Sequence, residues 1–587
     1  MVEFLLFKIE AAIPGPGLNQ ELLGLAAGLA IGWWLHHIQR GRFNPLRFLS
    51  VVPRKREIAM AILLAMSVAG RLAFWHWKSA PHPSAHDEFG YLLAADTFAH
   101  GRLTNPTPEF WTHFETYHEL MRPTYMPKYP PGQGLFLALG QVVFGSAFAG
   151  VLLSCGLMCA ALYWALAGMM PQRWAFLGAG LAVVRISWSS YWDNSYWGGA
   201  VAALGGCLVV GAAVRLNRRR TARDAGILAT GLWLLAISRP YEGMLLAVPV
   251  CLFVLVQLFR THCQAHLASA VATFAVIFAL GMSWLAYDNW RVTGHFAEAP
   301  YSEFVRQYQW APPLLFGAPR TPVYNSPSTQ KNEYVAPDLP RYIELRTFRG
   351  FIKESISRPA DIWSFFLDPG LGLLMLFGLV LCAKNRQLRW VWITLGFMVV
   401  GWEAEIWDFP HYFAPALPIL SALGMFGLRA LYSWRRTERT GAMLVTGGLL
   451  GLAVAFAPLP LIKLLNRREP ASASFRAAGD FRKSRVSVIA ALTGMPGDHL
   501  VLIRYRAGHL RSTEWVYNGH DIPSQRIIWA HDLDPEDSDQ PLICHYHDRH
   551  VWMLEPIDGG AWTPQQAKEA LKPVNTDQVC GGAPGAS

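Results

Sequence analysis

The sequence predicts a polytopic α-helical membrane protein with about 12 transmembrane helices, followed by a small α/β domain outside the membrane. Of the 587 residues, 52% are hydrophobic and only 16% are charged, whereas soluble proteins carry roughly 25% charged residues. The apolar residues gather in runs of roughly 20, the length that crosses a bilayer as a helix. After residue 465 such runs end and shorter β-type runs replace them.

The apolar runs define the predicted spans. The short runs 226–241 and 243–260 should meet around Arg239–Gly243. The run 147–169 has an apolar lead-in that starts at residue 134. The full set is 21–38, 57–77, 147–169, 174–192, 197–215, 226–241, 243–260, 267–286, 361–382, 389–407, 411–432 and 441–465.

The loops between these runs alternate in charge. On one side they are rich in Arg and Lys and contain two acidic residues, Asp224 and Glu438. Short basic loops stay in the cytoplasm, so the other side, with both termini, should face outward. The net charge of +10 therefore indicates topology rather than a surface for nucleic acid. The basic loops are 39–56, 170–173, 215–225, 260–266, 383–389 and 429–440.

The chain divides into three predicted parts. Residues 1–56 contain one additional transmembrane helix, 57–465 form the main transmembrane domain, and 466–587 form the outer α/β domain. The main domain carries two long outer loops, 78–131 and 287–360. Loops of this length without their own secondary structure are usually functional or disordered.

The outer domain is predicted from three β-type runs with a helix between the last two, a pattern typical of an α/β layer. Cys544 and Cys580 both fall in this domain, where oxidation is chemically accessible. A disulfide and two free thiols both remain open. The β-type runs are His499–Tyr505, Arg526–His531 and Val551–Glu555.

Adjacent carboxylates open the first outer loop. Asp87 and Glu88 follow His86 shortly after a predicted span, and such a pair could supply a general base or ligands for a cation. A structural role is the alternative, with Ser84 capping a helix whose first turn favours acidic residues.

Two basic residues are candidates for binding phosphate. Lys128 lies in Pro127–Gly134, a stretch of prolines and glycines directly before an apolar run, although a lysine there could also extend to the membrane surface. Arg239 lies between two apolar runs, and its planar group suits phosphate. A structural pair with Glu242 is the alternative. Arg185, inside the run 174–192, is a weaker candidate of the same kind.

Histidines and aromatic residues complete the candidate set. His411 and Tyr412 join two predicted spans on the outer side. His411 could bind substrate, and a purely structural role is the alternative. The aromatic residues of the Tyr191–Trp197 turn suit a membrane interface. His545, His547 and His550 have metal-ligand spacing, but a solvated helix explains them as well.

The order of these pieces resembles the GT-C superfamily of polytopic glycosyltransferases, in particular the lipid A aminoarabinose transferases and protein O-mannosyltransferases of glycosyltransferase family 39. The matching residues are Asp87-Glu88, then Lys128-Tyr129-Pro130-Pro131 before Leu135–Gly140, then Arg239–Gly243 and His411-Tyr412. The resemblance covers residues 57–430. The span 21–38 and the C-terminal domain depart from the simplest family pattern.

The resemblance implies transfer of a sugar from a polyprenyl-phosphate donor at the periplasmic face of a bacterial inner membrane. Asp87 matches the family's catalytic base, with Glu88 in reserve. Lys128 and Arg239 would stabilise the departing phosphate, and Tyr129, Glu242, His411 and Tyr412 would help to bind substrate. No cofactor is required, although Asp87, Glu88 and a phosphate could hold a divalent cation. The acceptor stays open among a glycolipid, a polysaccharide and a protein.

Two other functions fit the same residues. A transporter or flippase for a lipid-linked saccharide would also need cations and aromatic residues, but it should show repeat symmetry, and the sequence has no clear repeat. A non-catalytic membrane scaffold could use the C-terminal domain to recruit partners. The proximity of Asp87 and Lys128 separates a scaffold from an enzyme.

Overall fold

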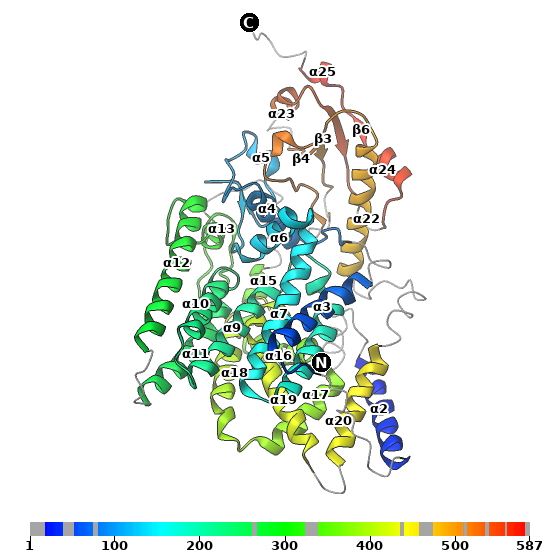
Figure 1. The fold of residues 1–587 in the computed structure, drawn as a ribbon. Helices are drawn as coiled ribbons and strands as arrows, with labels where there is room; N and C mark the ends of the chain where they lie inside the picture. Colours follow the sequence, from blue (N-terminus) through cyan, green and yellow to red (C-terminus); the bar gives the residue numbers. More distant parts are fainter. Residues whose placement is uncertain are drawn as a thin grey trace.

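Apolar helices form a bundle, and loops and a small sheet cover one of its ends (Figure 1). The computed structural model describes residues 18–38, 52–73, 80–260, 267–322, 338–434, 440–456, 473–506, 509, 513–533, 539–557 and 560–580. Of the basic residues that predict topology, Arg40, Arg42, Arg47, Arg435, Arg436 and Arg439 lie outside these ranges.

The bundle is built around α7 (Ala147–Met169), which is buried over most of its length. Its small residues permit close approach: a Cβ on Gly150 would lie 2.1 Å from the carbonyl oxygen of Phe136 in the adjacent helix. The other bundle helices are α2 (Leu18–Ile38), α3 (Arg56–Ala73), α6 (Gly132–Phe144), α8 (Gln172–Ala182), α9 (Ala200–Leu216), α10 (Ala222–Ala236), α11 (Pro240–Arg260), α12 (Leu267–Thr293), α17 (Pro369–Cys382), α18 (Arg389–Trp402), α19 (Leu417–Tyr432) and α20 (Thr440–Phe456). A π-helix, η2 (Val183–Trp188), extends α8, and the 3-10 turn η5 (Arg386–Leu388) precedes α18.

Within the described residues, four continuous helices are long and apolar enough to cross a membrane: Ala147–Met169, Pro240–Leu258, Leu267–Thr293 and Pro410–Tyr432. A bent pair of helices could add a fifth, and several shorter apolar helices pack beside them. The protein thus has the helices of a membrane protein, and the count of about 12 spans stays a prediction.

Two predicted spans are divided. The lead-in from residue 134 is a separate helix, α6, because Gly145 ends it in the left-handed region at φ 69°, a conformation that glycine adopts without strain. The run 361–382 crosses a bend of 105° between α16 (Phe348–Phe366) and α17. Asp368 caps α17 there by accepting a hydrogen bond from the backbone N–H of Leu371 at 2.8 Å. In contrast, α10 and α11 meet near Arg239 as predicted.

The additional N-terminal helix α2 packs along α20 through facing glycines. A Cβ on Gly28 would lie 2.2 Å from the carbonyl oxygen of Gly447 and from the backbone nitrogen of Gly451. Glycines spaced by four allow this backbone approach between membrane helices. The predicted span 21–38 is therefore an integral part of the bundle.

We call the covered end of the bundle the loop face; it comprises residues 80–131, 189–199, 294–322, 338–366 and 403–416. Its main helix, α4 (His86–Ala99), lies between the bundle and the C-terminal sheet (Figure 1). A short hairpin follows, in which β1 (Glu119–Leu120) pairs antiparallel with β2 (Met126–Pro127). The other elements of the loop face are α5 (Trp111–Phe114), η3 (Tyr191–Asp193), α13 (Pro300–Tyr308), α15 (Leu339–Leu345), α16 and η6 (Pro410–Ala416).

The C-terminal segment forms a four-stranded sheet in the order β4-β3-β5-β6. Strands β3 (His499–Ile503), β4 (Ile527–His531) and β5 (His550–Leu554) fall on the three predicted runs, and α23 (Gln540–His545) is the helix between the last two. Cys544 and Cys580 form a disulfide. The remaining elements are α22 (Ala473–Thr493), η8 (Ile522–Ser524), α24 (Pro564–Ala570), β6 (Lys572–Pro573) and α25 (Thr576–Cys580).

This sheet shares its hydrophobic core with the first outer loop. Phe89 of α4 stacks on Tyr517 with ring centroids 3.9 Å apart, and Leu93 and Tyr125 are buried against residues of β3 and β4. The C-terminal segment was predicted as a separate domain. In the structure its apolar face is covered by α4, whose own apolar residues need the same burial.

Candidate active site

The first turn of α4 gives Asp87 and Glu88 different surroundings. Glu88 is buried, and its Oε2 accepts hydrogen bonds from the backbone N–H groups of Ser84 (2.8 Å) and Ala85 (3.1 Å). Its Oε1 accepts from the backbone N–H of Tyr196 at 3.0 Å. Glu88 thus satisfies unpaired donors at a helix start and anchors the Tyr191–Trp197 turn. Both oxygens are occupied, so its placement does not favour the expected roles of reserve base and cation ligand.

Asp87 lies beside the Lys128-Tyr129 segment, as the sequence predicts. The hydroxyl of Tyr129 donates a hydrogen bond to Oδ1 of Asp87. His118 Nδ1 lies 2.6 Å from the Tyr129 hydroxyl and 3.6 Å from Oδ1 of Asp87. The Asp87 side chain is 27% exposed. It is therefore held in place on one oxygen and still accessible.

His118 was not predicted from the sequence. It directly precedes β1, and its φ of 66° is unusual for a residue with a side chain. Burial, followed by the charge of Lys128, holds the pKa of His118 well below its usual range. A neutral imidazole can donate one hydrogen bond to Tyr129, and the tyrosine hydroxyl then donates its own to Asp87.

Lys128 follows β2 and is buried against aromatic rings of α13. Its Nζ lies 4.7 Å from the centroid of Phe304 and 5.4 Å from that of Tyr301. Ammonium groups are attracted to aromatic faces at such distances. Lys128 also interacts with the carboxyl group of Asp338. Burial raises the pKa of Asp338 to about 6, although the positive charges of Lys128 and Arg341 act to lower it. Rather than extending to the membrane surface, this lysine points into the protein.

Arg239 lies at the junction of α10 and α11. Its guanidinium carbon is 4.4 Å from the ring centroid of Tyr412, and Nη1 is 3.6 Å from Oε1 of Glu242. The structural pair with Glu242 is therefore present. At 3.6 Å the pair is long for a charged hydrogen bond, so the guanidinium retains capacity for a further anion.

His411 belongs to an aromatic group that borders Arg239. Its Nδ1 lies 2.7 Å from the hydroxyl of Tyr191, and its ring centroid is 4.9 Å from that of Trp197. Its ring also stacks with that of Tyr412, which Arg239 covers. The aromatic turn expected at a membrane interface thus packs against the Arg239 side of the site.

The charges of Asp87 and Arg239 act on the same tyrosine hydroxyls. Tyr91, Tyr191 and Tyr412 each interact electrostatically with both residues. Contacts link the two sides: Tyr129, which binds Asp87, stacks on Tyr91 with centroids 4.5 Å apart, and Arg239 lies over the ring of Tyr412. The candidate site therefore contains a carboxylate, a guanidinium and several tyrosine hydroxyls.

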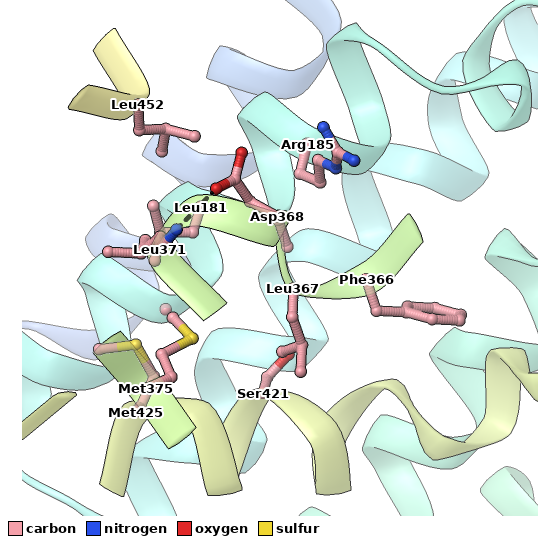
Figure 2. A pocket seen from close by; sticks show the side chains of 12 residues that line it. Leu181, Arg185, Phe366, Leu367, Asp368, Leu371, Met375, Ser421, Met425 and Leu452 are labelled. Atoms are coloured by element: carbon pink, nitrogen blue, oxygen red, sulfur yellow. Dashed lines mark hydrogen bonds between the residues drawn. The ribbon is translucent and has the colours of Figure 1, made fainter. Parts of the chain in front are cut away.

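Other candidates from the sequence lie elsewhere. Arg185 donates to Glu21 of α2 at 2.8 Å and to the backbone carbonyls of Phe365 and Ser364. It borders a small cavity of about 30 Å³ that Asp368 and apolar residues also line (Figure 2). Since its donors are engaged within the bundle, Arg185 anchors α2 rather than contributing to the site.

The histidines His545, His547 and His550 do not form a ligand group. Within the described part of the chain, the His, Cys, Asp or Glu side chains close enough to hold a metal together are Asp96, His100 and His520. These residues lie at the far end of α4 from Asp87. Their spacing in the sequence gave no signal, because Asp96 and His100 lie at the end of α4 and His520 lies in the loop before β4.

Comparison with known proteins gives structural matches alone. No protein-family model and no curated protein matches the sequence. The oligosaccharyltransferase of Archaeoglobus fulgidus, solved with a tethered acceptor peptide, is 11% identical with a TM-score of 0.43 and is matched over 77% of this chain. This chain spans 62% of that protein's length.

A second match is ArnT from Cupriavidus metallidurans, solved with undecaprenyl phosphate bound. It is 14% identical with a TM-score of 0.43, over 78% of this chain and 84% of that one. Both neighbours are glycosyltransferases with the GT-C fold, the class that the sequence motifs resemble. Because similarity at this level carries no functional inference, the function proposed below rests on the residues of the site.

Proposed function

We propose that this protein is a membrane glycosyltransferase that moves a sugar from a polyprenyl-phosphate donor to an acceptor hydroxyl on the non-cytoplasmic side. The observation that supports this most is the arrangement around Asp87. The Asp87 carboxylate is accessible and accepts a hydrogen bond from Tyr129, the residue that follows Lys128 in the chain. Asp87 and Arg239 also both act electrostatically on Tyr91 and Tyr412.

In the proposed reaction, the acceptor oxygen forms a bond to the anomeric carbon while the bond from that carbon to the phosphate oxygen breaks. The electron pair of the broken bond leaves with the phosphate. Asp87 takes the acceptor proton, a role that typically contributes on the order of 10² to 10⁴ in rate. Direct displacement inverts the anomeric centre.

Arg239 and Lys128 have the complementary role. The leaving phosphate gains negative charge in the transition state, and preorganised cations stabilise such charge most where water is excluded. Lys128 is buried among aromatic rings, and Arg239 lies on the face of Tyr412. Both positions fix the cation before the donor binds, which reduces the cost of reorganisation.

Tyr129 and His118 position the base. The tyrosine hydroxyl binds Oδ1 of Asp87, so we assign Oδ2 to the acceptor proton. Because burial holds the pKa of His118 well below its usual range, His118 serves as a neutral hydrogen-bonding partner of Tyr129.

The sidedness is part of the proposal. The loop face lies opposite the basic loops in the predicted topology, which places Asp87 and the C-terminal sheet outside the cytoplasm. Reporter fusions after Arg223 should read cytoplasmic, and a fusion after Asp498 should read non-cytoplasmic.

The test uses the purified full-length protein in sealed proteoliposomes with a donor that carries a labelled sugar on polyprenyl phosphate. A glycosyltransferase releases polyprenyl phosphate and transfers or hydrolyses the sugar. A flippase leaves the donor intact and changes only its leaflet, so an intact donor that changes leaflet would refute the proposal. Mass spectrometry of membrane glycolipids and envelope proteins from cells with and without the gene would then identify the acceptor.

A further inference from the structure

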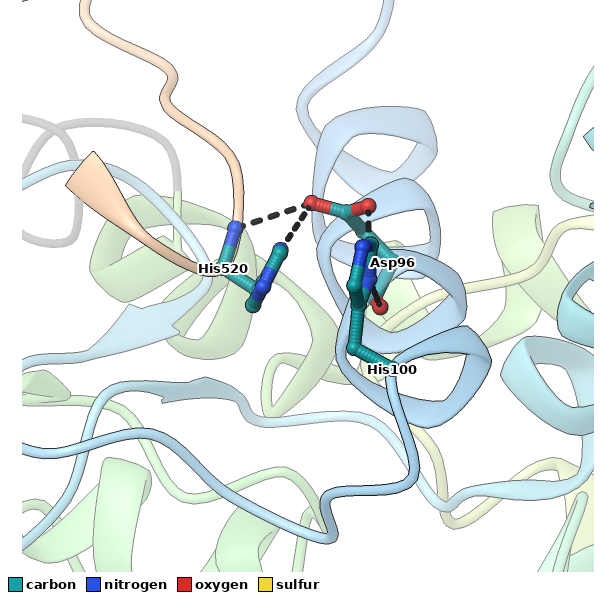
Figure 3. Close-up of side chains that lie close together, drawn as sticks. All are labelled: Asp96, His100 and His520. Carbon is teal, nitrogen blue, oxygen red and sulfur yellow. Dashed lines mark hydrogen bonds and ion pairs between the residues drawn. The ribbon is translucent and has the colours of Figure 1, made fainter. Parts of the chain in front are cut away.

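We infer that Asp96, His100 and His520 form a site for a zinc-like divalent metal that fastens the C-terminal sheet to α4. The three side chains converge where the C-terminal end of α4 meets the loop before β4 (Figure 3). This site is distinct from the proposed active site and does not depend on the proposed reaction.

The three side chains already lie close together. Nδ1 of His520 lies 2.8 Å from Oδ2 of Asp96. Nδ1 of His100 lies 3.6 Å from Oδ1 of Asp96 and 2.8 Å from the backbone carbonyl oxygen of the same residue. The two imidazole rings stack nearly parallel, with centroids 3.9 Å apart and 22° between their planes, so the His100 ring must turn to aim a nitrogen at the same metal as His520. One ligand atom from each residue lies within 4.8 Å of the others.

A modest movement completes the geometry. Ligands at about 2.1 Å from a tetrahedral metal are roughly 3.5 Å from one another, so Asp96 and His520, now 2.8 Å apart, must separate slightly while His100 moves toward them. The His100 side chain is 55% exposed and has room to make this movement. Asp96 and His520 are more buried and form the fixed part of the site.

The loop is built to present His520 to Asp96. The backbone N–H of His520 also donates to Oδ2 of Asp96, at 3.0 Å. A Cβ on Gly519 would lie 2.8 Å from the same oxygen, so a residue without a side chain permits this approach. The metal would replace the hydrogen that Asp96 and His520 now share.

The donor set selects the class of metal. Two imidazole nitrogens and one carboxylate oxygen suit zinc and related transition metals, whereas calcium and magnesium prefer all-oxygen sites. Three protein ligands leave one position of a tetrahedron for water.

Position indicates the purpose of the site. Asp96 belongs to α4, whose first turn carries Asp87, and His100 is the C-cap residue of the same helix, whereas His520 belongs to the C-terminal segment. At the other end of α4, His86 Nδ1 lies 2.6 Å from the hydroxyl of Tyr517. The C-terminal segment thus already contacts the N-terminal end of α4, and a metal would fix the C-terminal end of the same helix.

The test measures metal binding by the full-length protein in detergent, purified without a polyhistidine tag and treated with a chelator. Zinc is titrated by calorimetry, and cobalt by its visible absorption. The wild type should bind about one equivalent, with a cobalt spectrum typical of nitrogen and oxygen ligands. His100→Ala and His520→Ala should each weaken binding by more than about tenfold. His547→Ala, which removes another exposed histidine of the C-terminal segment, should bind like the wild type.

Thermal unfolding gives a second readout. Saturating zinc should raise the melting temperature of the wild type and leave that of His100→Ala unchanged. His100→Ala removes an exposed side chain, so it should fold even if His520→Ala does not. Zinc binding that is absent in the wild type, or unchanged in His100→Ala, would overturn the inference and leave Asp96 and His520 as a simple hydrogen-bonded contact.

Discussion

Replacing Asp87 with Asn tests the proposed base most directly. The amide keeps an oxygen that can accept the Tyr129 hydroxyl, so the side chain should stay in place. The second oxygen becomes an NH₂ group, which donates hydrogen bonds and takes no proton from the acceptor. We therefore expect turnover to fall by about 10² to 10⁴, which raises the barrier by about 3 to 5 kcal/mol.

The stability of the protein should change little. Asp87 is partly exposed and faces a neutral His118, so the substitution breaks no buried ion pair. The structure therefore predicts a variant that folds like the wild type and binds the donor, since Lys128 and Arg239 are intact, but turns over slowly. A change that reduced turnover through unfolding would instead lower the melting temperature as well.

The assay follows sugar release from a labelled polyprenyl-phosphate donor in nanodiscs, with donor binding measured separately. Asp548→Asn, an exposed change in the C-terminal segment, is the matched control and should be active. Wild-type turnover by a well-folded Asp87→Asn would refute the assignment of the base. Glu88→Gln offers no simple replacement test. Backbone N–H groups donate to both oxygens of Glu88, and the amide nitrogen of a glutamine would face them with another donor. The substitution should therefore weaken the start of α4.

Three further predictions concern charge and stability. Arg239→Ala should weaken donor binding and turnover together, whereas Arg239→Lys should restore part of the binding, because an ammonium keeps the charge but not the planar fork; equal loss in both variants would contradict a charge role. Asp338 has a pKa raised from 3.8 to about 6 in the folded protein, so its contribution to stability is full below pH 3.8 and is lost as the pH rises through 6. This amounts to about 3 kcal/mol, and melting curves of Asp338→Asn should lack that part of the pH dependence. Finally, replacing Cys544 and Cys580 with Ser opens a link across 36 residues and should destabilise the C-terminal sheet by up to about 4 kcal/mol; unchanged protease resistance of this segment would show that its packing on α4 suffices.

Several residues of the candidate site stand out in the sequence because local chemistry marks them. Asp87 and Lys128 stand out as charged residues beside apolar runs, and both lie in one connected group around Tyr129. Arg239 lies at the junction of two helices, and the break between two apolar runs in the sequence predicts this position. The strands β3, β4 and β5 were also predicted, since β-type runs between turn residues carry their own signal.

Other residues could not be predicted because their roles depend on distant partners. His118 is one of 19 histidines in the chain, and nothing near it in sequence distinguishes it from the others. Tyr301 and Phe304 lie in a loop where aromatic residues carry no signal of their own. Glu88 matched the expected pattern as well as Asp87 did, and only the backbone donors around it distinguish its surroundings from those of Asp87.

The sequence by itself determined that the chain is an apolar helical protein with basic loops between its runs, and that polar candidates gather in the loops opposite them. These properties follow from composition and order along the chain, because the length of an apolar run decides whether it can cross a bilayer and the basic residues of the loops set the orientation. The tertiary structure decided which candidates meet. It placed the C-terminal segment on α4, brought His520 to Asp96 across 424 positions, and turned Arg185 toward Glu21. Such contacts depend on how apolar faces pack, and no local pattern encodes the partner that a buried polar group finds.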